Sequence, residues 1–401
     1  MPLELSPSRL PRVAAPGLYV HIPFCFHKCH YCDFYSITRQ TPDRMTRFVD
    51  LVLSEADQWT GNAGPVVVPR TVFFGGGTPT LLPMDAMRRL INGLRQRFDF
   101  SQCNEWTVEA NPATVTGEYF QMLRECGADR ISMGAQSFDQ ADLAMLERHH
   151  DPDDVPAGLE LARAAGFSRL NLDLIYAICG QTLESWRKSL ETAISLHTEH
   201  LSCYALTYEA NTPLAVRRRL GRVSAVAEEV ELEMAGEARR RLRQCGLEGY
   251  EISNHARPGS ECRHNMIYWT GGDYIGLGPS AASHVQGWRW KNAGHLGEWE
   301  NAVGAGALPA KDVEQLSPMR RVGELAMLSL RLSRGLIYSD FQERFGVDAA
   351  EAFSAIITRY TSQGLLEADA AGARLTEEGW RVADALASEF LAEAATMDCS
   401  K

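Results

Sequence analysis

Short runs of hydrophobic, β-prone residues alternate with longer amphipathic stretches along the first half of the chain. The stretches repeat their apolar positions with the helical period. The short runs span residues 18–22, 71–74, 106–109, 130–133, 170–175 and 201–206, and the stretches include 84–98, 117–126, 153–165 and 183–196. This alternation predicts parallel strands joined by crossover helices. We therefore expect an α/β fold with a partial (β/α)6 TIM-like barrel. Spacing alone leaves a doubly wound open sheet as the alternative.

The positions of polar residues favour the barrel, because barrel enzymes place their chemistry at the carboxyl ends of the strands. A cysteine-rich loop follows the first run, and three glycines, residues 75–77, follow the second. Glu109 ends the third run, Gln136 follows the fourth and Asp173 lies in the fifth. We expect these features to meet at one end of the barrel.

The composition changes along the rest of the chain and suggests four regions. We expect an N-terminal segment (1–17), the barrel (18–210), a connecting region rich in glycine and aromatic residues (211–310) and a C-terminal, mostly helical domain (311–401). In the last region, stretches 321–332, 338–345, 349–363 and 377–394 predict helices, and residues 365–367 and 373–375 predict a short hairpin. Helices followed by a hairpin resemble a winged-helix unit.

Charge limits the classes of partner. The chain has 40 basic and 51 acidic residues, a balance of −11, so it has no general attraction for nucleic acid or anionic membranes. Residues 310–401 include 10 basic and 15 acidic residues, a balance that argues against DNA binding by the C-terminal domain. No apolar run reaches the roughly 20 residues of a membrane span. We expect a cytoplasmic protein.

The ten cysteines do not form a disulfide framework, which is typical of short secreted chains. Three of them follow the spacing Cys25-x3-Cys29-x2-Cys32 and indicate a metal site. Thiolates suit zinc or an iron–sulfur cluster. A zinc site needs a fourth ligand, for which His21, His27 and His30 are candidates. A [4Fe-4S] cluster held by three cysteines instead leaves one iron open.

With Tyr31 before its third cysteine, this loop resembles that of the radical S-adenosylmethionine superfamily. The motifs at 19–25, 74–80, 134–138 and 171–176 are similar to those of oxygen-independent coproporphyrinogen III oxidases and their relatives. The resemblance implies a [4Fe-4S] cluster on Cys25, Cys29 and Cys32, with S-adenosylmethionine on the open iron. It implies cofactor contacts from Tyr19, Tyr31, Gly76, Gly77, Thr78, Glu109, Gln136, Arg148 and Asp173.

Two departures distinguish the branches of this family. The oxidases carry a further cysteine where this chain has Phe34, and a longer amino-terminal region. In both respects this chain resembles the heme chaperone branch, and its motif from His264 to Trp269 is also similar to that branch. That branch implies heme binding, with His264 and Tyr268 as candidate heme contacts in a porphyrin-binding region 211–310, and transfer to an acceptor hemoprotein.

Two alternatives stay open at this point. The first is a coproporphyrinogen III oxidase, an enzyme that removes carboxyl groups from propionates by radical chemistry and needs an electron donor. The second is a structural zinc protein. One further departure crosses both branches: the family usually reads Tyr-Gly-Leu-Pro-Gly-Gln-Thr where this chain has Ala177 and Cys179 in residues 176–182. We expect these two substitutions to be neutral, with altered cofactor packing as the alternative.

Overall fold

The computed structural model describes residues 5, 10–11, 13, 16–60 and 67–399, so the predicted segment 1–17 lies largely outside it. Six parallel strands pair in the order in which they follow in the chain. They are β1 (Gly17–Ile22), β2 (Thr71–Gly76), β3 (Glu105–Ala110), β4 (Arg130–Gln136), β5 (Arg169–Tyr176) and β6 (His200–Ala205). This order confirms the partial barrel, because a doubly wound sheet reverses its strand order at a switch point.

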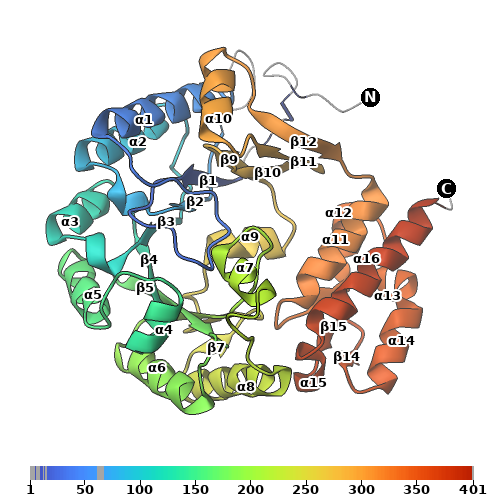
Figure 1. Ribbon diagram of the computed structural model, residues 1–401. Coiled ribbons are helices and arrows are strands. Elements are labelled where there is room, and N and C mark those ends of the chain that lie inside the picture. Colours follow the sequence, from blue (N-terminus) through green and yellow to red (C-terminus); the bar gives the residue numbers. More distant parts are fainter. Residues whose placement is uncertain (1–4, 6–9, 12, 14–15, 61–66, 400–401) are drawn as a thin grey trace.

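Helices cover the outside of these strands as a ring (Figure 1). Several begin at a threonine whose side chain accepts a hydrogen bond from the first turn, as Thr41, Thr116 and Thr182 do. The ring comprises α1 (Pro42–Asp57), α2 (Met84–Arg95), α3 (Gly117–Glu125), α5 (Asp154–Ala164) and α6 (Leu183–Ser195). The short α4 (Gln140–Met145) follows β4 and ends beside the cysteine loop.

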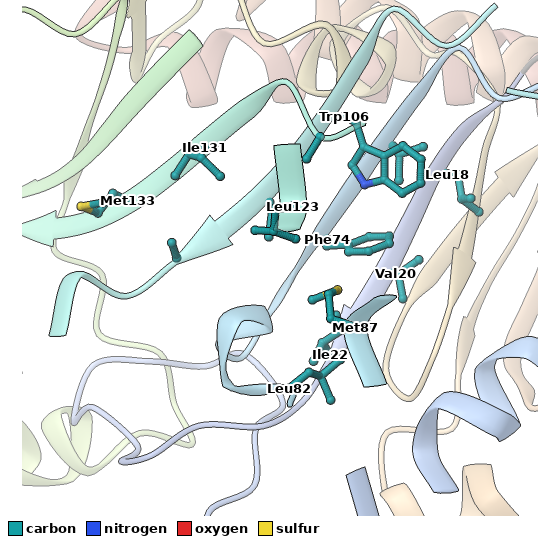
Figure 2. Packing of buried hydrophobic residues seen from close by; sticks show 14 of the residues in the cluster. Leu18, Val20, Ile22, Phe74, Leu82, Met87, Trp106, Leu123, Ile131 and Met133 are labelled. Carbon is teal, nitrogen blue, oxygen red and sulfur yellow. The ribbon is translucent and has the colours of Figure 1, made fainter. Parts of the chain in front are cut away.

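The main hydrophobic core lies between the strands and this ring. Leu18 and Val20 of β1 are fully buried beside Phe74 of β2, and Met87 of α2 and Leu123 of α3 close the layer from outside (Figure 2). Successive side chains of a strand point to opposite faces. The residue between Leu18 and Val20, Tyr19, therefore faces the interior of the barrel.

Residues 211–310, which we expected to connect two domains, continue the barrel sheet. β9 (Tyr274–Leu277) pairs in parallel with β1, and three antiparallel strands extend that edge. At the other edge β8 (Asn254–Ala256) pairs with β6, which gives a twelve-stranded sheet. The remaining elements are α7 (Pro213–Arg219), α8 (Glu228–Gln244), β7 (Glu248–Gly249), α9 (Arg263–Trp269), β10 (Ala282–Val285), β11 (Trp288–Asn292), α10 (Leu296–Gly304) and β12 (Ala310–Gln315).

The C-terminal elements form a separate lobe with its own hydrophobic core (Figure 1). The predicted hairpin is present, and β13 joins it as a third strand that the pattern did not predict. The predicted helices 349–363 and 377–394 are each broken in two. The elements are α11 (Pro318–Leu330), β13 (Leu336–Ile337), α12 (Tyr338–Phe345), α13 (Ala349–Ala352), α14 (Ser354–Ser362), β14 (Leu366–Ala368), β15 (Gly372–Leu375), α15 (Glu377–Trp380) and α16 (Ala383–Cys399). Among the described residues, no helix has the length and apolar character needed to cross a membrane.

A buried carboxyl group joins α1 to the extension of the sheet. Glu55 accepts hydrogen bonds from the backbone N–H of Gly278 (2.8 Å), from Asn292 Nδ2 (2.6 Å) and from Trp299 Nε1 (2.9 Å). Burial nevertheless raises the pKa of Glu55 to about 8. The folded protein therefore holds a proton here that the unfolded chain releases near its ordinary pKa of 4.5.

We expect the melting temperature to fall as the pH rises from about 6.5 to about 8, because in this window the folded state binds the extra proton. Buried histidines with lowered pKa values, such as His21 and His264, act in the opposite direction only below about pH 6.5. Thermal unfolding of Glu55→Gln should show a flatter pH dependence, whatever its absolute stability. Glu118→Gln, at an exposed position of α3, should keep the parent slope, and equal slopes for parent and Glu55→Gln would contradict the assignment.

Candidate functional site

A cavity of about 790 Å³ occupies the interior of the barrel. Its size falls within the range of ligand pockets, about 300–1,000 Å³. It extends from the loops at the carboxyl ends of the strands to α9 at their amino ends, and every site residue expected from the sequence lines it. These are Tyr19, Cys25, Cys29, Tyr31, Cys32, Gly76, Gly77, Thr78, Glu109, Gln136, Arg148, Asp173, His264 and Tyr268.

The cysteine loop lies between β1 and α1 on the wall of this cavity. Cys25, Cys29 and Cys32 are free thiols. The Thr78 hydroxyl donates to Cys25 Sγ over 3.8 Å, and Arg148 Nη1 donates to Cys29 Sγ over 3.8 Å. Two segments far apart in the chain therefore hold hydrogen-bond donors toward the thiols. Burial raises the pKa of the Cys25 thiol, and the Thr78 hydroxyl and the Arg148 charge act against this shift.

The spacing of the thiols fits a cluster better than a single ion. The three sulfurs are not all within 4.8 Å of one another, whereas a zinc ion with bonds of about 2.3 Å brings its sulfur ligands to about 4 Å. The expected fourth ligands do not join them. Both ring nitrogens of His21 are engaged, by the Tyr19 hydroxyl (3.0 Å) and by the Tyr35 carbonyl (2.8 Å), and His27 and His30 lie against Glu147 instead. The structural zinc alternative is not supported.

The glycine-rich turn after β2 supports the base of the cysteine loop. The N–H groups of Gly77 and Thr78 donate to the carbonyls of Ile22 (2.9 Å) and Phe24 (2.7 Å). A Cβ atom on Gly77 would lie 2.7 Å from the Phe24 carbonyl oxygen and 2.8 Å from that of Ile22. Only glycine allows this approach of two backbones.

Gly77→Ala should therefore lower the iron content of the reconstituted protein, because the start of the cysteine loop must move away from the new methyl group. Overpacking of this kind costs about 1–3 kcal/mol. Iron and sulfide analysis after anaerobic reconstitution measures the effect. Gly117→Ala, whose Cβ would meet its nearest neighbour at 3.5 Å, should load iron as the parent does. Equal loading of both variants would show that the turn does not position the cysteines.

Two carboxyl groups lie on the cavity wall beyond the glycine turn. The N–H of Gly76 donates to Glu109 Oε2 over 3.1 Å, and burial together with the charge of Asp173 raises the pKa of Glu109 to about 8. Asp173 accepts hydrogen bonds from the hydroxyl of Ser132 (3.2 Å) and from Asn171 Nδ2 (2.8 Å). The partners expected for a carboxylate among apolar residues are therefore present.

A polar network of Ser132, Asn171 and His200 lies behind these carboxyl groups and was not predicted from the sequence. Asn171 also donates to the Ser132 hydroxyl (2.7 Å), and its Oδ1 lies 2.6 Å from His200 Nδ1. The signal was an alternation of polar and apolar residues in β4 and β5, since Ser132, Asn171 and Asp173 occupy interior positions between fully buried hydrophobic ones. Further missed residues on the cavity wall are Arg130, Ser202 and Asn254.

Gln136 and Arg148 meet at Gly134. Gln136 has a left-handed backbone with φ of 64°, and Arg148 Nη2 donates to the Gly134 carbonyl over 2.8 Å. A Cβ on Gly134 would lie 2.7 Å from the Gln136 side chain and 2.8 Å from that of Arg148. The Arg148 Nε also donates to His150 Nδ1 (3.2 Å), which fixes the guanidinium beside Cys29.

His264 and Tyr268 lie at the opposite end of the cavity from the cysteine loop. The N–H groups of Arg263 and His264, at the start of α9, donate to Glu105, the first residue of β3. His264 Nδ1 pairs with the Thr71 hydroxyl and Nε2 with the Tyr268 hydroxyl, each at 2.8 Å. Burial lowers the pKa of His264 to about 4. An iron ligand at His264 requires one of these hydrogen bonds to break.

The two unusual residues after β5 do not line the cavity. Ala177 has a left-handed backbone with φ of 58°, a conformation that suits the glycine usual in the family. Cys179 is buried, and its Sγ lies 3.1 Å from the Tyr208 hydroxyl. Their side chains therefore pack behind the cavity wall.

The chain is similar to known proteins over most of its length. The family model of the radical SAM superfamily matches residues 19–193, and that of the HemN C-terminal domain matches residues 316–382. The chain is 32% identical to heme chaperone HemW of Bacillus subtilis, with 94% of this chain and 99% of that protein covered. It is 37% identical to heme chaperone HemW of Escherichia coli, with 67% and 70% covered.

A solved structure shows the same fold. Coproporphyrinogen III oxidase (HemN) from Escherichia coli, described as a radical SAM enzyme, superimposes with a TM-score of 0.82. The superposition covers 96% of this chain and 91% of that one, at 24% sequence identity. At this identity the likeness concerns architecture, and it extends through the barrel and the C-terminal lobe together.

Proposed function

The chain belongs to the heme chaperone HemW family of the radical SAM superfamily, and on this premise we propose that it binds heme and passes it to an acceptor hemoprotein. The observation that carries the proposal is a pair of aromatic side chains on the cavity wall. Phe26 and Phe34 are 78% and 66% exposed and line the cavity beside the cysteines. Exposed aromatics at a cavity offer flat apolar contact area of the kind a porphyrin needs.

Replacing both phenylalanines by serine should weaken heme binding at least about tenfold, since a buried Phe side chain contributes about 1.5–3 kcal/mol. Absorbance titration of the cluster-loaded protein with heme measures the change. Leu220→Ser removes an exposed hydrophobic residue that does not line the cavity and serves as the control. Unchanged affinity in the double variant would remove the cavity aromatics from the heme site.

The superfamily binds a [4Fe-4S] cluster and S-adenosylmethionine, and the described residues fit both. Cys25, Cys29 and Cys32 hold the cluster in this proposal. When bound, the cluster supplies an open iron position and a one-electron carrier. The cofactor would lie beside the glycine turn. Its polar groups would be met by side chains that line the cavity, because the N–H groups of Gly76, Gly77 and Thr78 already have partners. We assign its contacts to Tyr19, Tyr31, Gly76, Gly77, Thr78, Glu109, Gln136, Arg148 and Asp173.

His264 and Tyr268, at the other end of the cavity from Phe26 and Phe34, are a second proposed set of heme contacts within region 211–310, and a pair of variants tests them. Tyr268→Phe frees His264 Nε2 while keeping the ring in place, so it should preserve or strengthen ligation to heme iron. His264→Ala should weaken heme binding and change the position of the Soret band. If His264→Ala binds heme with the parent spectrum, the histidine only anchors α9 to β2.

The oxidase alternative predicts a further cysteine where this chain has Phe34. We therefore expect no turnover of coproporphyrinogen III, and an external electron donor is needed only if radical chemistry takes place. Nine free thiols among the described residues support the cytoplasm as the proposed location.

A further inference from the structure

A second group of metal-ligating side chains lies on the cavity wall near the cysteine set. His27 of the cysteine loop and Glu147 and His149 after α4 each place one ligand atom within 4.8 Å of the others. No other group of three His, Cys, Asp or Glu residues in the described part of the chain has this spacing. His27 and His149 line the cavity, and His149 is exposed.

One imidazole of this group, that of His27, has an unused nitrogen. The rings of His27 and His149 meet edge to face with centroids 4.2 Å apart. His27 Nε2 is shielded from solvent and has no hydrogen-bond partner among the described residues, and the same holds for His30 Nδ1, which lies 3.9 Å from Glu147 Oε1. Buried polar atoms normally have a partner, so the His27 nitrogen points to a ligand.

The carboxylate of the group is held at a backbone position that disfavours it. Glu147 follows Leu146, the C-cap residue of α4, and has a left-handed φ of 54°. Glycine is the usual residue there, because a Cβ atom adds strain. A strained non-glycine residue at such a position is often kept for its side chain.

We propose that His27, Glu147 and His149 bind one late first-row divalent cation such as Zn²⁺. Two imidazoles and one carboxylate form a donor set that zinc uses in proteins, with a fourth position left for water. The ion joins the cysteine loop to the segment that carries Arg148, whose guanidinium contacts Cys29. None of its donors is one of the three cysteines, and the inference does not depend on heme binding.

Equilibrium dialysis of the cluster-loaded protein against Zn²⁺, with zinc and iron measured together, tests this site. The parent protein should bind one zinc ion per chain and keep its iron. His149→Ala and Glu147→Gly should each weaken zinc binding at least about tenfold. Glu147→Gly removes the carboxylate and the backbone strain together, so it should fold at least as well as the parent.

His197→Asn provides the matched control. His197 is exposed, as His149 is, and has a left-handed backbone with φ of 51°, as Glu147 does, but it lies outside the group. Zinc should raise the melting temperature of the parent and of His197→Asn, but not that of Glu147→Gly. Three results would overturn the proposal. They are no bound zinc in the parent, equal zinc affinity in Glu147→Gly, and zinc binding that is accompanied by loss of iron.

Discussion

Cys29→Ser yields a protein that no longer holds the [4Fe-4S] cluster: after anaerobic reconstitution it should be colourless, with iron and sulfide near background. A hydroxyl is a poor substitute for a thiolate toward iron, and three cysteines are the only protein ligands in this proposal. The same loss is expected for Cys25→Ser and Cys32→Ser. Absorbance in the visible range and metal analysis measure it directly.

Cys126→Ser is the matched control for this prediction. Cys126 is 6% exposed and Cys29 is 8% exposed, so both changes place a hydroxyl at a buried position. Cys126 caps α3, and its Sγ lies near Met122 Sδ, away from the cavity. This variant should load iron as the parent does. A brown Cys29→Ser protein with full iron content would refute the ligand assignment.

The largest effect on stability is expected for Glu105→Gln. The Glu105 side chain is buried and pairs with Arg169, and it accepts the N–H groups at the start of α9. Although burial opposes it, Arg130 and Arg169 hold the pKa of Glu105 below its ordinary value. The neutral amide removes the charge that acts on the buried Arg130 and leaves Arg169 with Asp129 as its remaining partner. Loss of one partner of a buried ion pair costs about 3–5 kcal/mol. Urea unfolding measures this loss.

An exposed ion pair gives the comparison. Glu184 pairs with Lys188 on the surface of α6, where water and salt screen the interaction. Glu184→Gln should leave the unfolding midpoint unchanged. Equal midpoints for Glu105→Gln and Glu184→Gln would show that α9 does not depend on the carboxylate. Because α9 carries His264, loss of Glu105 should also disturb the amino end of the cavity.

The barrel strands could be predicted from the sequence because short β-prone runs alternate regularly with amphipathic helical stretches. β2, for example, was expected at residues 71–74 and extends over Thr71–Gly76, since the two glycines add no apolar side chain to the pattern. The site followed from the same logic. Parallel strands bring their carboxyl ends together, so Cys25, Glu109 and Asp173 meet at one cavity.

The extension of the sheet could not be predicted in this way. Strands β7 to β11 are two to five residues long, which is too short for a period to emerge. The environment of His264 was equally hidden, because its partner Thr71 is 193 positions away in the chain. Contacts of this kind depend on tertiary packing and leave no local pattern.

The proposal that this chain carries heme, and does not decarboxylate a porphyrinogen, is tested most directly by one paired assay on the anaerobic, cluster-loaded protein. One half is titrated with heme, mixed with an apo-hemoprotein and followed by absorbance. The other receives coproporphyrinogen III, S-adenosylmethionine and a reductant. We expect the first half to show heme binding and transfer to the acceptor, and the second half to form no protoporphyrinogen. Protoporphyrinogen formation without heme binding would contradict it.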